Sequence, residues 1–187
     1  MIKTKTILLI IILTIFTIVM TACKQQDLVI HNFEGNYMSY HTFEAIEEVA
    51  DAIIIAKTKQ DFSKREHSIQ LTNEGTIQDF HTLTVVEVLD IVKQPLTSPL
   101  TKNTTLKIVE PIAYDRKLQE MYTMNNYRAI EKHKTYVLFL AHNGKDNYGI
   151  INMNNGKFLL KGSANENNSS IFMGFKQKHT DIIKKYQ

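Results

Sequence analysis

Asp51-Ala52-Ile53-Ile54-Ile55-Ala56-Lys57 is the stretch that decides the fold, because it places five apolar residues in a row between two charged ones. So short a run, rich in β-branched side chains, predicts a buried β-strand. Residues 42–50, directly before it, predict a short helix. Thr42 can cap that helix, and Phe43 and Ile46 recur at helical spacing.

Further strands are predicted along the chain from alternating or strongly apolar runs at residues 77–93, 104–110, 135–140, 148–151 and 158–160. In the first of these, the inward-facing set changes from Leu83 and Val85 to Val86 and Val88, which predicts a β-bulge. Asn155-Gly156 predicts a tight hairpin between the last two strands. The polar residues 61–76 are expected to form a long loop.

The remaining segments predict helices and a linker. Residues 113–132 carry apolar side chains at roughly helical intervals and predict a helical insertion that is irregular at Asn125-Asn126. The C-terminal residues predict a short cationic helix around Ile182. Residues 23–41 are mostly polar and predict a tether, with a short strand at 28–30 as the alternative. Residues 42–187 are therefore expected to form one domain.

The predicted order of three strands, a helix and at least two more strands resembles the small Greek-key barrel of the OB type. Residues 48–57 are similar to the first barrel strand of the netrin-like modules, which include the tissue inhibitors of metalloproteinases. Lys134-Thr135-Tyr136-Val137-Leu138 resembles a later strand of that family, and the likeness covers about residues 48–160. The resemblance implies a mainly β fold with flanking helices (α+β), built on a five- to six-stranded OB or netrin-like barrel.

The resemblance implies the barrel fold but not the inhibitory mechanism. Those inhibitors use a disulfide-tethered N-terminal cysteine to chelate zinc. Cys23 has no partner cysteine in this chain and lies far before the strand at 51–57.

The N-terminus predicts a secretory leader. Lys3 and Lys5 precede a largely apolar run over residues 7–20, which is short for a membrane span but typical of a signal peptide. Residues 1–22 are therefore expected to be removed. A retained transmembrane anchor is the alternative.

The end of this run indicates the kind of leader. Met20-Thr21-Ala22-Cys23 resembles the lipobox of bacterial lipoproteins, in which the cysteine thiol receives a diacylglyceryl group and becomes the first mature residue. Ordinary cleavage after Ala22 is disfavoured because Met20 is large. A free core cysteine is the other alternative. The strand sequences over residues 48–160 are also similar to those of small lipoproteins of Gram-positive bacteria. We expect Cys23 to anchor the chain on the cell membrane, outside the cytoplasm.

Composition limits the remaining functions. The chain has 187 residues and a formal net charge of +3, and loss of Lys3 and Lys5 with the leader lowers that charge to +1. A nearly neutral body does not favour nucleic acid as a partner. The single cysteine excludes an internal disulfide framework and any multi-cysteine metal site.

Candidate chemistry is sparse. The seven histidines show no helical zinc-ligand spacing, and the sequence holds neither a nucleophile elbow nor a Gly-rich phosphate loop. Glu47-Glu48 and Asp51 could serve as paired carboxylates for acid–base catalysis, but a cluster of charges around a helix explains them equally well. We therefore predict no catalytic residue, no metal and no cofactor.

Tyrosines offer the best candidates for a ligand surface, because a tyrosine ring buries area while its hydroxyl finds a partner. The candidates are Tyr114, Tyr122 and Tyr127, and core packing is the alternative for each of them. The sequence thus predicts a lipid-anchored, non-enzymatic binding module for a protein or cell-envelope ligand. An inhibitor of an extracellular hydrolase and an enzyme with an unrecognised site are the alternatives.

Overall fold

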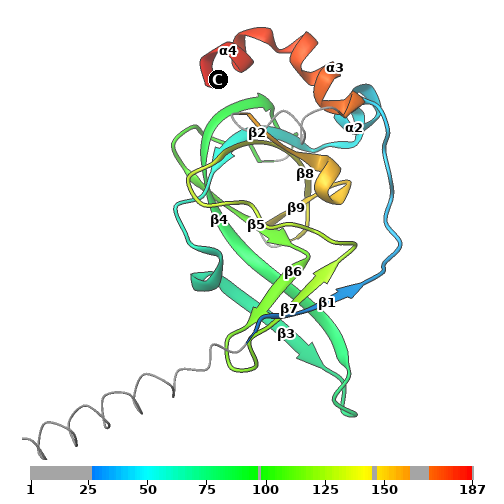
Figure 1. Ribbon diagram of the computed structural model, residues 1–187. Coiled ribbons are helices and arrows are strands. Elements are labelled where there is room, and N and C mark those ends of the chain that lie inside the picture. The colour runs from blue at the N-terminus through cyan, green and yellow to red at the C-terminus, as the bar shows by residue number, and fades with distance from the viewer. Residues whose placement is uncertain (1–26, 97, 145–146, 161–168, 187) are drawn as a thin grey trace, which may run out of the picture.

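The computed structural model describes residues 27–96, 98–144, 147–160 and 169–186. Five strands form a closed barrel in the order β2-β4-β5-β9-β8, with β8 pairing back onto β2 (Figure 1). Only the β5–β9 pair is parallel. The barrel strands are β2 (Ala52–Lys57), β4 (Ile77–Lys93), β5 (Thr105–Glu110), β8 (Thr135–His142) and β9 (Asn147–Ile150).

This strand order is OB-like, which confirms the predicted fold class. The short strand β10 (Lys157–Leu159) extends the sheet by pairing with β8. Asn155-Gly156 lies in the 3₁₀ helix η2 (Met153–Gly156) that precedes it. The predicted hairpin between 148–151 and 158–160 is therefore wrong, because both strands pair with successive parts of one edge of β8 and not with each other, while β2 takes the other edge.

Strand β2 is buried on both faces, which explains its unbroken apolar sequence. Ala52, Ile54 and Ala56 point into the barrel, where they pack with residues of the other barrel strands. Ile53 and Ile55 point outward into a second core beneath the helices.

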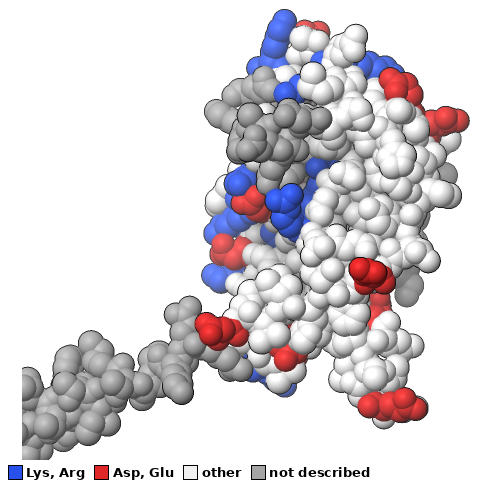
Figure 2. All heavy atoms as spheres, turned by 45° about the vertical axis from the view of Figure 1, so that its right-hand side comes forward, with Lys and Arg blue, Asp and Glu red and all other residues white. Residues whose placement is uncertain are grey.

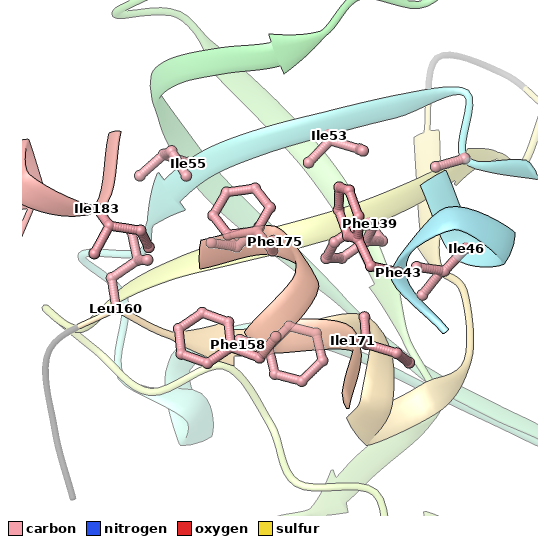
Figure 3. Close-up of a cluster of buried hydrophobic side chains, with 13 residues drawn as sticks. Phe43, Ile46, Ile53, Ile55, Phe139, Phe158, Leu160, Ile171, Phe175 and Ile183 are labelled. Carbon is pink, nitrogen blue, oxygen red and sulfur yellow. The ribbon is translucent and has the colours of Figure 1, made fainter. Parts of the chain in front are cut away.

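Three helices cover this outer core: α2 (Phe43–Val49), α3 (Ser170–Lys178) and α4 (Thr180–Tyr186). Figure 3 shows Phe175 of α3 among Ile53 and Ile55 of β2 and Phe139 of β8. The Thr42 hydroxyl accepts a hydrogen bond from the N–H of Ala45, which confirms the predicted cap. The C-terminal helix is confirmed as α4, whereas α3 was not expected. None of the helices within the described ranges is long and apolar enough to cross a bilayer.

An ionic cluster joins α4 to the barrel. The Asp90 carboxylate of β4 accepts hydrogen bonds from Lys102, from Lys185 at 2.8 Å and from the N–H of Ile91. Burial opposes ionisation of this carboxyl, but these hydrogen bonds outweigh it and lower its pKa to about 2.

A second sheet packs against the part of β4 that extends beyond the barrel (Figure 1). Its order is β1-β7-β6, and β1 runs parallel to β7. Strand β3 pairs with the same part of β4. The elements are β1 (Val29–Phe33), β6 (Ile112–Asp115), β7 (Glu120–Met124), β3 (Glu66–Leu71) and the 3₁₀ helix η1 (Phe62–Lys64).

This second sheet corrects three predictions. Residues 113–132 are not a helical insertion, since strands β6 and β7 form a hairpin and Gln119, Asn125 and Asn126 adopt positive φ angles that break any helix. Within the segment 23–41, residues 29–33 form β1, which supports the alternative of a short strand there over a tether throughout. The expected loop at 61–76 contains η1 and β3.

The bulge in β4 exists, but not where it was predicted. Even-numbered residues from Phe80 to Asp90 are buried without interruption, so the inward set does not change at Val86. The β2–β4 register shifts between Ile53 and Ile54 and between Ile55 and Ala56, at the far end of β4. The bend therefore lies where β4 closes the barrel.

Candidate functional site

The second sheet has one covered face and one partly open face. On the covered face, His31 stacks on Tyr122 with ring centroids 5.1 Å apart, and Phe33 lies 5.3 Å from Phe80. Strand side chains alternate between the two faces. The open side therefore carries Leu28, Ile30, Asn32, Ile112, Tyr114, Met121 and Thr123.

Two adjoining cavities lie along this open side, with volumes of about 670 and 680 Å³. Both are lined by Phe62 and Met121, so they form one groove. We call it the sheet-face groove and define it by Leu28, Ile30, Phe62, Tyr114, Met121 and Ala129. Each volume falls within the range of ligand sites, and the lining is mostly apolar.

A buried ion pair lies behind the groove. Arg65 Nη1 donates to Glu110 Oε1 at 3.0 Å, and both side chains are fully buried. The Thr84 hydroxyl donates to the same carboxylate oxygen. Burial lowers the pKa of Arg65, although the neighbouring carboxylate opposes that shift. Because the pair is sealed from solvent, the groups that bond to it cannot form hydrogen bonds to water instead.

This ion pair fixes both walls of the groove. The Arg65 guanidinium lies 5.5 Å from the centroid of the Phe62 ring and donates through Nη2 to the carbonyl of Ile130 at 2.5 Å. Glu110 Oε2 accepts from the Tyr127 hydroxyl at 2.9 Å and from the N–H of Ile130 at 2.8 Å. Helix η1 on one wall and residues 127–130 on the other are thus held by one charge pair.

His67 ties helix η1 to the floor of the groove. Its Nε2 lies 2.9 Å from the carbonyl of Phe62, which can only accept a hydrogen bond, and its Nδ1 accepts from the N–H of Tyr114 at 3.3 Å. The Nε2–H donates to the Phe62 carbonyl, and Nδ1 also lies 2.8 Å from the Thr82 hydroxyl. Burial lowers the pKa of His67, which favours the neutral imidazole.

The three candidate tyrosines differ in their surroundings. Tyr114 is half-buried, lines the groove and donates its hydroxyl proton to Gln119 Oε1 at 2.8 Å. Tyr127 is 2% exposed and supports the groove from within. Tyr122 is 6% exposed and lies on the opposite face of the sheet, where a hydrogen bond to Glu120 raises its pKa to about 12. Tyr122 and Tyr127 are therefore buried in the core, which is the alternative given for each of them, and Tyr114 is the candidate with a half-buried side chain in the groove.

Other candidates make structural contacts. Glu47 pairs with Lys178 of α3 at 2.7 Å, and the Asp51 carboxylate accepts from the N–H of His142 at 2.8 Å. Within the described ranges, no three His, Cys, Asp or Glu side chains are placed to hold a metal ion together. Cys23 lies outside the described residues.

Phe62, Arg65 and Glu110 were not predicted from the sequence. Phe62 and Arg65 lie in the segment expected to be a polar loop. Glu110 carried a usable signal, because it has the same parity as the inward-facing Leu106 and Ile108 of β5. A carboxylate on the inner face of a strand indicates a buried partner.

Comparison with known proteins gives no match to this chain, whether against protein families, curated proteins or solved structures.

Proposed function

We propose that this chain is a lipid-anchored, extracytoplasmic binding module that holds a protein or cell-envelope ligand in the sheet-face groove. The observation that carries the proposal is the position of this apolar groove. It begins at Asp27 and Leu28, only four and five residues after Cys23. Along the chain, the lipobox-like sequence therefore ends only a few residues before the first residue that lines the groove.

The character of the groove favours binding over catalysis. Its lining is largely apolar, with a few polar groups near its ends, as in many sites that bind a small ligand. The polar groups next to it hold the walls in place: the Tyr114 hydroxyl bonds to Gln119, and His67 bonds to Phe62. Such a site presents a shaped apolar surface and no aligned nucleophile and base.

A diacylglyceryl group on Cys23 would make the attachment durable. Two acyl chains hold a protein on a membrane, since each buried CH₂ contributes about 0.8 kcal/mol, whereas one chain binds only reversibly. The anchor keeps the groove near the membrane surface. The cysteine is then an attachment point and takes no part in recognition.

The anchor is tested by replacing Cys23 with Ser. The unchanged chain is expected to incorporate radiolabelled palmitate and to fractionate with membranes. Cys23→Ser should lose the label and move to the medium or accumulate with its leader. An unlabelled wild-type chain with a free thiol on residue 23 contradicts the proposal.

The groove is tested by photo-crosslinking on intact cells. A photoreactive amino acid at Met121, inside the groove, is compared with the same group at Met173, which is 56% exposed on α3. We expect one discrete adduct from position 121 and none from position 173. Equal yields from both positions, or no adduct from position 121, would argue against the groove as the ligand site.

A further inference from the structure

Four large aliphatic side chains are exposed together at one end of the molecule. Leu28, Val29 and Ile30 are 46%, 46% and 60% exposed, and Leu118 is 52% exposed. The backbone joins them, since the N–H of Val29 donates to the carbonyl of Gln119 at 3.1 Å. Leu28 and Ile30 point to the open side of the sheet and Val29 to the other side, so exposed aliphatic groups surround the start of β1 and make it a candidate interaction surface.

Two cations flank these side chains. Arg116 and Lys117 are exposed in the turn between β6 and β7, directly before Leu118. The Asp115 carboxylate accepts hydrogen bonds from the N–H groups of Lys117 and Leu118, at 2.8 and 3.2 Å, and so fixes the turn. We call the six residues the anchor-side patch: Leu28, Val29, Ile30, Arg116, Lys117 and Leu118.

Aliphatic side chains bordered by Lys or Arg suit the boundary between lipid headgroups and acyl chains. The distance along the chain points to the same occupant. Cys23 precedes Asp27 by four residues, which span at most about 14 Å when fully extended. An acyl group on Cys23 therefore holds the patch within reach of the bilayer surface.

We propose that the anchor-side patch rests on the bilayer, with its aliphatic side chains at the interface and its two cations on anionic headgroups. This inference rests on the proposed acylation of Cys23. It fixes the orientation of the body: one end of the sheet-face groove, at Leu28, opens toward the membrane, and the end at Ala129 and Asn154 faces away.

The C-terminal helices are the competing cationic surface. Lys176, Lys178, Lys184 and Lys185 lie on α3 and α4, and Lys and Arg side chains gather at this end of the molecule in Figure 2. These helices lie at the end opposite β1 and the β6–β7 turn (Figure 1). The short connection from Cys23 holds β1, and not α3 or α4, next to the membrane.

The orientation is tested with a fluorescent label on the acylated full chain. Acylation occupies the only cysteine, so Leu118→Cys or Met173→Cys introduces a unique reactive thiol. Each labelled protein is placed in phosphatidylglycerol vesicles with or without lipids that carry a nitroxide quencher. We expect about threefold or greater quenching at position 118 relative to position 173, because only the interfacial end is close to lipid.

Three results overturn the inference: equal quenching at the two positions, stronger quenching at position 173, or a label at position 118 shielded from aqueous iodide but not quenched by lipid. The last would show that protein, such as a second copy of this chain, covers the patch. Failure of the anchor itself is separate. In that case the unmutated chain reacts with maleimide at Cys23 and does not stay with the vesicles.

Discussion

Replacing Glu110 with Gln is expected to destabilise the protein far more than its single-atom change suggests. The two carboxylate oxygens accept hydrogen bonds from four donors: Arg65, Thr84, Tyr127 and the N–H of Ile130. A Gln side chain offers one oxygen and turns an NH₂ group toward at least one donor. The hydroxyls can rotate to accept a hydrogen bond, but the guanidinium and the backbone N–H cannot.

The magnitude follows from burial. Arg65 and Glu110 are both fully buried, so the substitution leaves a guanidinium without its counter-charge in the interior. Removing one partner of a buried ion pair costs about 3–5 kcal/mol, against a total of about 5–15 kcal/mol for a domain of ordinary stability. We therefore expect Glu110→Gln to lower the free energy of unfolding by about 3–5 kcal/mol.

Urea unfolding followed by circular dichroism measures this change on residues 24–187, which retain every described core residue. Arg65→Met should cost a similar amount, because it strands the carboxylate. The double variant should cost less than the sum of the two single changes, since neither charge is left unpaired. A loss below about 1 kcal/mol for Glu110→Gln, or strict additivity, would refute the account of the cluster.

Three further outcomes are expected. The pKa of Asp90 is lowered to about 2, so its carboxylate contributes fully to the free energy of unfolding above pH 4 and loses that contribution as the pH falls toward 2. Asp90→Asn should remove about 2 kcal/mol of this acid-dependent stability, measured by urea unfolding across that range. The pKa of His67 is lowered by burial, so the free energy of unfolding should decline as the pH falls below 6.5 while the unfolded chain takes up the proton. His67→Gln should reduce that decline, and the pKa of His179, which burial also lowers, should maintain part of it. Gly174→Ala should cost about 1–3 kcal/mol, since its Cβ would lie 2.5 Å from Cβ of Phe43, whereas an exposed alanine substitution elsewhere on α3 should be nearly neutral in the same assay.

The barrel could be predicted because its strands carry their own signals. Strand β2 is apolar throughout since both of its faces are covered, and β5 alternates because one face points inward. The second sheet gave a misleading signal. Leu118, Met121 and Tyr122 recur at helical spacing, yet Leu118 lies in the turn before β7, and Met121 and Tyr122 point to opposite faces of that strand.

The groove could not be predicted because it depends on contacts between distant segments. Strand β1 forms only by parallel pairing with β7, and such pairing leaves no local turn signal between the two strands. Arg65 and Glu110 are 45 residues apart in the sequence. Arg65 lies in a segment that was predicted to be a loop, and Glu110 lies at the end of strand β5. The sequence did contain one signal, the alternation of side chains along each strand. Thr84 lies on the same inward face of β4 as Val86, and Glu110 on the same inward face of β5 as Ile108.

The buried ion pair makes more sense as a device for placement than for stability. Apolar residues of similar volume often replace a buried pair with no loss of stability, because they avoid the cost of removing two charges from water. Apolar residues could not, however, accept hydrogen bonds from the Tyr127 hydroxyl and the N–H of Ile130, or donate one to the Ile130 carbonyl. Those bonds fix residues 127–130 opposite Phe62. A double variant that unfolds normally but crosslinks poorly from position 121 would separate the two roles, and it would locate the function in the groove rather than in the barrel.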